Sequence, residues 1–82
     1  EDNVLESLLK VLQTLAVKLG RPSGRLVEIA TYLTQEELSQ MVVARRERVS
    51  TALNSLRRQG IVQYSPGGHL LVDMPALESH KA

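Results

Sequence analysis

The chain has 82 residues, a formal net charge of +1 and no cysteine. A chain of this length forms a single domain and buries about 60% of the surface that its unfolded form exposes. The absence of cysteine excludes disulfides, a thiol nucleophile and cysteine-based metal sites. The sequence has no secretory pattern and no apolar run long enough to cross a bilayer, so we expect a cytoplasmic protein with no membrane partner. Because it opens with Glu1 and not with methionine, we also expect a piece of a longer protein.

The first predicted element is an amphipathic helix from Val4 to Leu19, where leucines and other apolar residues recur at helical spacing. The three polar residues before it, 1–3 (EDN), suit a helix N-terminus, and Gly20 is the expected C-cap. The apolar stripe is broad enough for a second packing partner outside this sequence.

The next stretch combines a loop with a short strand. Residues 21–24 (RPSG) are typical of a loop because they hold proline, serine and glycine. Residues 26–29 (LVEI) are mainly apolar and partly β-branched, which predicts a strand. We expect Tyr32 to pack beneath that strand.

A capped helix is predicted from about Gln35 to Val42. Thr34 is a good N-cap and Glu37 follows it by three residues, so the two are expected to form a capping box. Leu33 and Leu38 lie on either side of the cap, at the positions of a hydrophobic staple. The apolar pattern breaks after this helix and restarts a few residues later, which predicts two helices joined by a tight turn.

The second helix of the pair is predicted from about Arg46 to Gln59, with Gly60 as its C-cap. One face is apolar at helical spacing, which predicts burial of Val49, Ala52, Leu53 and Leu56. The opposite face can form hydrogen bonds throughout and consists of Arg46, Glu47, Ser50, Thr51 and Asn54, with Arg45 and Arg48 beside it. Residues 43–60 hold five arginines and one acid, the densest positive charge in the chain.

Two apolar runs close the predicted fold. Residues 61–64 (IVQY) and 70–72 (LLV) are separated by a segment with Pro-Gly-Gly, a pattern that predicts a β-hairpin. A hairpin that directly follows such a helix pair is the wing of a winged helix. Residues 74–82 (MPALESHKA) are expected to form a polar tail with one or two apolar anchors.

The polar face of the second helix has the chemistry of a DNA recognition helix. Arginine can bridge O6 and N7 of guanine, and glutamate can accept a hydrogen bond from N4 of cytosine. A charge run is usually a solvated face, but such a face mixes Lys with Glu, whereas this one has three arginines in four residues and no lysine. We therefore interpret residues of about 45–58 as a recognition helix for the major groove of double-stranded DNA, with the wing, 61–73, on the phosphate backbone.

The ordered combination resembles the C-terminal DNA-binding domain of the Crp/Fnr (cyclic-AMP receptor protein) family of transcription regulators. The matching stretches are LTQEELSQMV, RRERVSTALNSLRRQGIV and the hairpin. With the first helix and the strand, the resemblance covers nearly the whole chain. It implies a bacterial regulator that is a homodimer at full length, with RNA polymerase as a candidate partner. It also implies a small-molecule effector in an N-terminal sensor domain that this sequence lacks, and no cofactor within the sequence itself.

The fold class that follows is α+β and mainly helical, a winged helix-turn-helix with a preceding amphipathic helix and a C-terminal β-hairpin wing. We divide the chain into an N-terminal packing helix (1–20), a winged helix-turn-helix DNA-binding domain (21–75) and a tail (76–82). No repeat, low-complexity segment or second domain is visible in the sequence.

Site residues are carried over from the family by alignment. The base-reading positions lie in the first two turns of the recognition helix and fall on Arg46, Glu47, Ser50 and Thr51. Contacts to the phosphate backbone are expected from Thr34, Gln35, Arg45, Arg48, Asn54 and His69.

The sequence departs from the family pattern at three of these or neighbouring positions. Many members have Gly where this chain has Val43, and many have Ser or Thr where it has Arg45, so its recognition helix lacks an obvious N-cap. Most have an Arg that touches a base or a phosphate where this chain has Thr51. Arg48 stands where Thr is common and can take over the role of that missing arginine.

Other chemistries find little support in the sequence. His69 and His80 are isolated from further ligands, so no metal site is expected. His69 can touch a phosphate from the wing, although a solvated turn residue is the plainer interpretation. Ser23 and Ser65 have no base nearby in sequence, and we therefore expect no catalytic residue and no enzyme.

Two alternative functions stay open. The main one is a winged-helix module that binds protein without binding DNA; it would need no arginine-rich helix, so Arg45, Arg46 and Arg48 argue against it. The other is a DNA binder of a different winged-helix family that senses a ligand within the same domain. No cavity-lining polar group in the sequence points to that second alternative.

Overall fold

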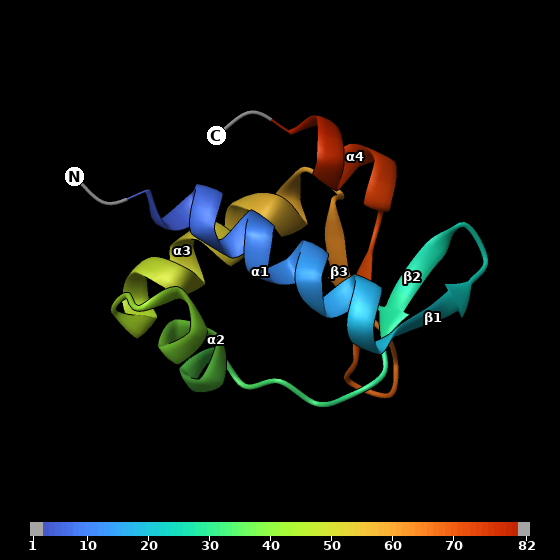
Figure 1. The fold of residues 1–82 in the computed structure, drawn as a ribbon, viewed down its shortest axis with the longest axis horizontal. Helices are drawn as coiled ribbons and strands as arrows, with labels where there is room; N and C mark the ends of the chain where they lie inside the picture. The colour runs from blue at the N-terminus through green and yellow to red at the C-terminus, as the bar shows by residue number, and fades with distance from the viewer. Residues whose placement is uncertain (1–2, 81–82) are drawn as a thin grey trace.

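The computed structural model describes residues 3–80. Its elements, in chain order, are α1 (Val4–Leu19), β1 (Gly20–Ser23), β2 (Leu26–Ile29), α2 (Gln35–Val42), α3 (Arg46–Arg58), β3 (Val62–Tyr64), β4 (Leu70–Val72) and α4 (Met74–Ser79) (Figure 1). The α+β, mainly helical winged helix-turn-helix that we predicted is confirmed. The expectation for residues 1 and 2 as part of a helix N-terminus lies outside the described residues.

Helix α1 runs through the middle of the molecule, with α2 and α3 on one side and the sheet beside its C-terminal end (Figure 1). The sheet is antiparallel throughout and has the strand order β1-β2-β4-β3. Its two hairpins are joined by the pairing of Val27 in β2 with Val72 in β4. The β3–β4 hairpin, which we call the wing, is therefore a continuation of the first hairpin's sheet.

The core lies where the helices meet the sheet. The predicted buried face of α3 is confirmed, because Val49, Leu53 and Leu56 are fully buried and Ala52 nearly so. Fully buried leucines from α1 and α2 meet this face, and the sheet adds Ile29, Val62 and Val72. Each such side chain contributes about 1.5–3 kcal/mol relative to full exposure, so the orientation of α3 is set mainly by its apolar side. Its polar face is consequently turned outward.

The segment 20–23 is a strand and not the loop that we predicted for residues 21–24. β1 pairs with β2 in register from Gly20 opposite Ile29 to Ser23 opposite Leu26, and the tight turn between them holds Gly24 at φ 65°. β1 is at the edge of the sheet, where Pro22 is tolerated. Its strand conformation comes from pairing with β2. The polar sequence of β1 gives no indication of this pairing.

The C-terminal segment is also more ordered than the predicted polar tail. Residues 74–79 form α4, whose first turn is capped by the Asp73 side chain accepting a hydrogen bond from the backbone N–H of Ala76 at 3.3 Å. Leu77 anchors the helix because it is 3% exposed. The expected apolar anchor is thus present, but within a helix. Residues 81 and 82 lie outside the described part of the chain.

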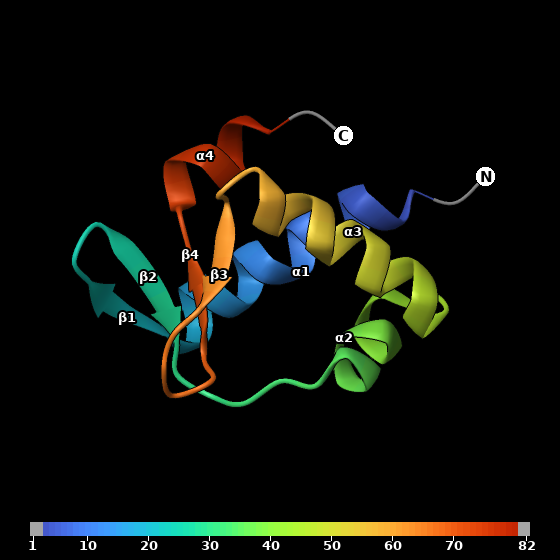
Figure 2. The same cartoon turned by 180° about the vertical axis from the view of Figure 1, so that it is seen from behind.

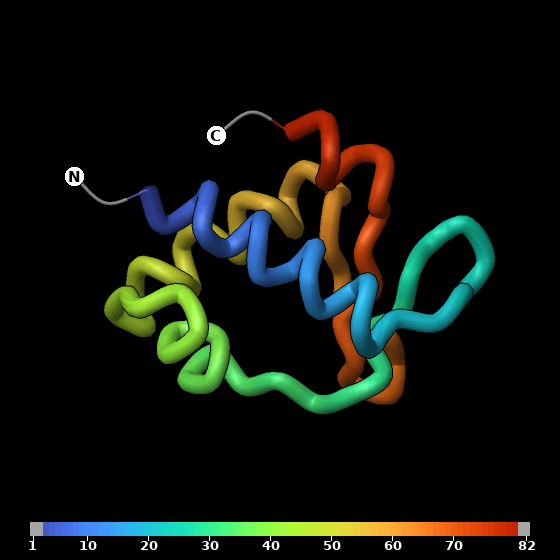
Figure 3. Tube along the Cα trace, viewed as in Figure 1, coloured from blue at the N-terminus to red at the C-terminus, as the bar shows by residue number. Residues whose placement is uncertain are grey.

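The linker from β2 to α2, residues 30–34, passes next to the loop of the wing (Figure 3). Tyr32 in this linker is 68% exposed, so our expectation that it packs beneath the strand is wrong. Its ring touches the ring of His69 in the wing, with 4.5 Å between the two centroids. Within residues 3–80, no helix is both long and apolar enough to span a membrane.

Candidate nucleic-acid interface

The start of α2 is fixed by the capping box that the sequence predicts. The backbone N–H of Glu37 donates to Thr34 Oγ1 at 3.0 Å, and the backbone N–H of Thr34 donates to Glu37 Oε1 at 2.9 Å. Leu38 is fully buried and Leu33 packs against the core, in keeping with a staple. The N-terminal turn of α2 is therefore held rigidly, and Gln35 is its first residue.

The turn between α2 and α3 carries a strained residue. Val43 ends α2 in the left-handed conformation, with φ 59° and ψ 56°, and is 88% exposed. A β-branched side chain is disfavoured there, whereas glycine is not. Arg45 is the N-cap of α3 and makes no side-chain capping bond, as expected from its lack of a short polar side chain.

The outward face of α3 brings together the residues predicted to read bases. Arg46, Glu47 and Thr51 are exposed on its first two turns, and Arg45 and Arg48 flank them and are also exposed. Figure 2 shows α3 in front of α1, with no other element covering it. Among residues 3–80, no hydrogen bond or ion pair engages the side chain of Arg46 or of Glu47, so both can bind a partner.

Two hydroxyls on this face are already engaged. Ser50 is half-buried, and its Oγ donates to Oε1 of Gln35 on α2, so a predicted base reader is joined to a predicted backbone-binding residue. Thr51 Oγ1 donates to the backbone carbonyl of Glu47, one turn earlier, at 3.0 Å. The Ser50–Gln35 bond ties the start of α2 to the middle of α3.

A groove between α3 and β3 adds basic residues that sequence reasoning did not single out as site residues. It is lined by Asn54, Arg57 and Arg58 from α3 and by Gln63 from β3, among others. The Arg57 guanidinium lies 5.2 Å from the centre of the Tyr64 ring, a cation–π distance. The sequence indicates these two arginines only through the high density of arginine in residues 43–60. Their proximity to β3 depends on the fold and has no local sequence signal.

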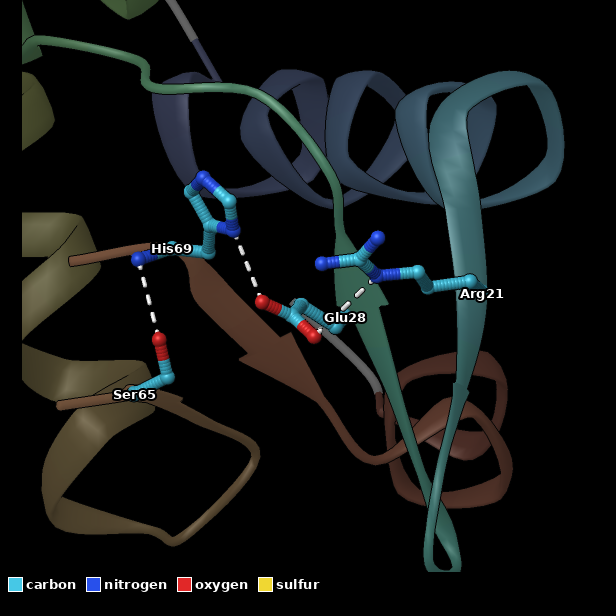
Figure 4. Close-up of polar contacts among 4 residues, drawn as sticks. All are labelled: Arg21, Glu28, Ser65 and His69. Atoms are coloured by element: carbon cyan, nitrogen blue, oxygen red, sulfur yellow. Dashed lines mark hydrogen bonds and ion pairs between the residues drawn. The ribbon is translucent and has the colours of Figure 1, made fainter. Parts of the chain in front are cut away.

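In the wing, His69 lies against the first hairpin. His69 Nδ1 lies 2.7 Å from Oε2 of Glu28 on β2, and Arg21 Nε donates to Glu28 Oε1 at 3.4 Å (Figure 4). The His69 side chain is only 17% exposed, so its interpretation as a solvated turn residue is wrong. The hydrogen bonds from His69 and Arg21 lower the pKa of the Glu28 carboxyl below its usual value, against a smaller opposing effect of burial. Glu28 therefore stays ionised at neutral pH.

The described residues offer no other site of comparable definition. No group of three or more His, Asp or Glu side chains among them could hold a metal ion. Other open grooves are lined by α1 alone or by α1 together with the polar side of α3, the end of α2 or the β1–β2 hairpin. The outward face of α3, the start of α2 and the wing are thus the candidate interface.

Several solved structures share this fold. Reduced CprK without a ligand superposes with a TM-score of 0.81 at 22% identity, over 93% of this chain and 36% of that one. Oxidized CprK in complex with o-chlorophenolacetic acid gives 0.83 at 20% identity, over 98% and 35%. The CO-dependent transcription factor CooA from Carboxydothermus hydrogenoformans, in its imidazole-bound form, gives 0.80 at 27% identity, over 94% and 35%. The chain thus spans about a third of the length of these proteins.

Sequence comparison agrees with the fold. No curated protein matches the chain. Residues 6–80, nearly the whole sequence, match the profile described as the Crp-like helix-turn-helix domain. The chain therefore belongs to the family of Crp-like helix-turn-helix domains, the DNA-binding domains of transcription regulators.

Proposed function

We propose that this domain binds double-stranded DNA sequence-specifically, with α3 in the major groove, Arg46 and Glu47 reading bases, and the wing along the phosphate backbone. The observation that carries the proposal is the exposed first two turns of α3, where Arg45, Arg46 and Arg48 surround Glu47. The buried face of α3 fixes this polar surface outward. A helix of this kind fits the width of the major groove.

Arg46 and Glu47 have complementary base preferences. The Arg46 guanidinium, which no other side chain of residues 3–80 engages, can donate two hydrogen bonds to O6 and N7 of guanine. A carboxylate brings negative charge toward phosphates, which lowers affinity for DNA in general. Glu47 therefore favours binding only at sites where a base such as cytosine donates a hydrogen bond to its carboxylate. Its role is to discriminate between sequences.

The intramolecular hydrogen bonds of this surface decide which groups can still bind DNA. This applies to Ser50, Thr51 and Gln35. Because Ser50 donates to Gln35, its Oγ remains an acceptor, while the Gln35 amide nitrogen remains a donor for a phosphate. The N-terminal end of α2, where Gln35 lies, also favours an anion through the helix dipole. Thr51 has its hydroxyl engaged with the backbone, which leaves its methyl group to pack against thymine.

The remaining interactions are proposed to be with phosphates. The candidates on the helices are Thr34 before α2, Arg45 before α3, and Arg48 and Asn54 on α3, and all four are exposed. The wing, β3–β4, is proposed to add further phosphate contacts. Arg57 and Arg58 add positive charge along the groove between α3 and the wing. Phosphate binding of this kind positions the helix but carries no sequence information.

We also propose that the chain is the DNA-binding part of a longer regulator that works as a homodimer and responds to a small molecule. The support is the share of about 35% that it covers of structurally similar proteins, one of which is a CO-dependent transcription factor. Two recognition helices about one helical turn of DNA apart would then read a palindromic site. RNA polymerase is a candidate partner of such a protein.

The test compares two arginines on the same helix. Arg46→Ala should weaken binding to a preferred duplex by about 1–3 kcal/mol more than binding to random DNA, because it removes a bidentate interaction with a base. Arg58→Ala removes the same charge from the far end of α3 and should weaken binding to both duplexes equally. Fluorescence anisotropy titrations of both variants on both duplexes decide the question. Equal losses on the two duplexes for Arg46→Ala would mean that Arg46 binds phosphate.

A further inference from the structure

We propose that Glu28, on β2, is a positioning residue that holds the wing in place for the DNA backbone by binding His69. This inference rests on the proposed function, since it concerns how the wing meets DNA. It assigns a role in DNA binding to a strand outside the helix-turn-helix and to a carboxylate, a group that by charge alone opposes DNA binding.

Both arms of the wing loop converge on His69. The backbone N–H of Ser65 donates to the His69 carbonyl at 2.8 Å, and the His69 N–H donates to Ser65 Oγ at 3.1 Å. These two bonds close the loop around a single residue. Because the His69 ring is bound at 2.7 Å to Glu28, a restraint on that ring is a restraint on the whole loop (Figure 4).

The hydrogen bond between Glu28 and His69 is largely shielded from solvent. The side chains of Glu28 and His69 are 18% and 17% exposed, so water competes weakly for their hydrogen bond. The ring of Tyr32 touches that of His69 at a tilt of 59°. Gly68, at φ 91°, leaves space for Tyr32, since a Cβ there would come within 3.2 Å of the Tyr32 ring. A Cβ at that position would require the Tyr32 ring to shift by a few tenths of an ångström.

The hydrogen bond to Glu28 decides which ring nitrogen of His69 can face DNA. A carboxylate can only accept, so the Nδ1 atom of His69 must carry the proton in its bond to Glu28. In the neutral ring this leaves Nε2 as an acceptor, which cannot bind a phosphate oxygen. Because its Nδ1 is held by Glu28, the His69 ring acts as an anchor for the wing. Backbone N–H groups and other wing atoms would bind the phosphates instead.

The contacts of Glu28 and His69 join three parts of the fold. Glu28 belongs to β2, His69 to the wing, and Tyr32 to the linker that ends at Thr34, the N-cap of α2. Arg21 on β1 holds the other oxygen of the Glu28 carboxylate. The position of the wing is thus fixed relative to the start of α2, which carries proposed phosphate-binding groups of its own.

The experiment uses the 82-residue chain and asks whether removal of the Glu28 carboxylate raises or lowers the affinity for DNA. Removing a negative charge should tighten DNA binding if charge is all that matters, and Glu78→Ala, an exposed carboxylate on α4, is the matched control for that effect. We expect Glu28→Ala to weaken binding instead, equally for preferred and random duplexes. The slope of log Kd against log salt should fall by about 0.9 for each phosphate that the variant no longer neutralises. Glu28→Gln, which keeps an acceptor for Nδ1, should recover part of the affinity.

Two further measurements separate positioning from folding. The double variant Glu28→Ala/His69→Ala should bind DNA as tightly as the single variant with the lower affinity, because both changes break the same hydrogen bond. Without DNA, the Ser65 amide should exchange faster with solvent in Glu28→Ala, while the core amide of Val49 keeps its protection. Unchanged Ser65 exchange together with equal or tighter DNA binding would overturn the inference. Failure of the unmodified chain to bind DNA would instead refute the proposed function, and Ser65 exchange would still test the anchor.

Discussion

Val43 occupies a backbone conformation that its own side chain opposes, at the turn that sets α3 against α2. Its φ of 59° is in the left-handed region, which costs an L-residue about 1–2 kcal/mol. The side chain is 88% exposed, so its packing offsets little of this cost. The family pattern has glycine here in many members, consistent with a backbone requirement at this position.

Replacing Val43 by glycine should therefore stabilise the domain. We expect a gain of about 1 kcal/mol in the free energy of unfolding, because glycine relieves the backbone strain. The greater entropy of the unfolded chain with glycine offsets only part of this gain. Urea denaturation followed by circular dichroism measures it. Val43→Ala keeps a Cβ and should gain less. A loss of stability in Val43→Gly would show that the exposed valine makes interactions that compensate for its conformation.

Glu28 should give the stability of the domain a defined dependence on pH. Its pKa is lower in the folded chain than the usual 4.5, because it accepts hydrogen bonds from His69 and Arg21. The carboxylate therefore stabilises the fold above that value, and the contribution is lost as the pH falls through the folded pKa. The urea midpoint of Glu28→Gln should lie below that of the unmodified chain at about pH 6, and the difference should shrink as the pH falls through the folded pKa of Glu28. A difference that does not shrink would contradict this account.

At the scale of elements, the junction of α1 with β1 depends on the absence of a side chain. Gly20 has an extended backbone conformation, so it is not the left-handed cap that glycine usually provides. Its importance is steric, since a Cβ would lie 2.1 Å from the carbonyl oxygen of Ala16 and 2.5 Å from Cγ1 of Val27. The helix and the first hairpin meet at this point.

Gly20→Ala should accordingly destabilise the domain by about 1–3 kcal/mol, the range for overpacking. Gly67→Ala is the matched control in the wing loop, where the nearest atom to a Cβ, Ser65 Oγ, would be 3.8 Å away. Its effect should be neutral or slightly stabilising. Thermal unfolding of the two variants compares them directly. Equal melting temperatures would mean that α1 and β2 can move apart at little cost.

The elements that the sequence predicts well are those whose apolar residues follow a period. The bounds of α1 and α2 are confirmed, and α3 ends one residue earlier than expected. Its C-cap is therefore Gln59 and not the predicted Gly60, which follows at φ 78°. β1 could not be predicted because GRPS has no alternating apolar pattern and becomes a strand only through its partner. α4 is six residues long, too short for a helical period to be distinguished from a tail with one apolar anchor.

Long-range pairing explains why part of the candidate interface could not be predicted. The outward face of α3 follows from its buried face, so Arg46 and Glu47 could be placed from the sequence. The bond from Ser50 to Gln35 joins residues fifteen apart, and that from His69 to Glu28 joins residues 41 apart. Such pairs depend on the packing of separate elements, for which no local pattern exists.

On the scale of the whole molecule, the chain presents one recognition helix and one wing. One such surface can read only a half-site of a few base pairs, and a domain of this size binds few phosphates. We therefore expect affinity nearer the non-specific range of about 10⁻⁴–10⁻⁶ M than the specific range. Tethering two copies at the right separation should raise affinity, since the second binding event becomes intramolecular.

The most direct measurement is the selection of bound sequences from a randomised duplex library by the 82-residue chain and by Arg46→Ala. We expect the unmodified chain to enrich a single short motif containing a G·C pair. Arg46→Ala should lose preference at that pair while keeping the others. Enrichment of no motif by the unmodified chain, or of an identical motif by both proteins, would contradict the claim that α3 reads DNA through Arg46.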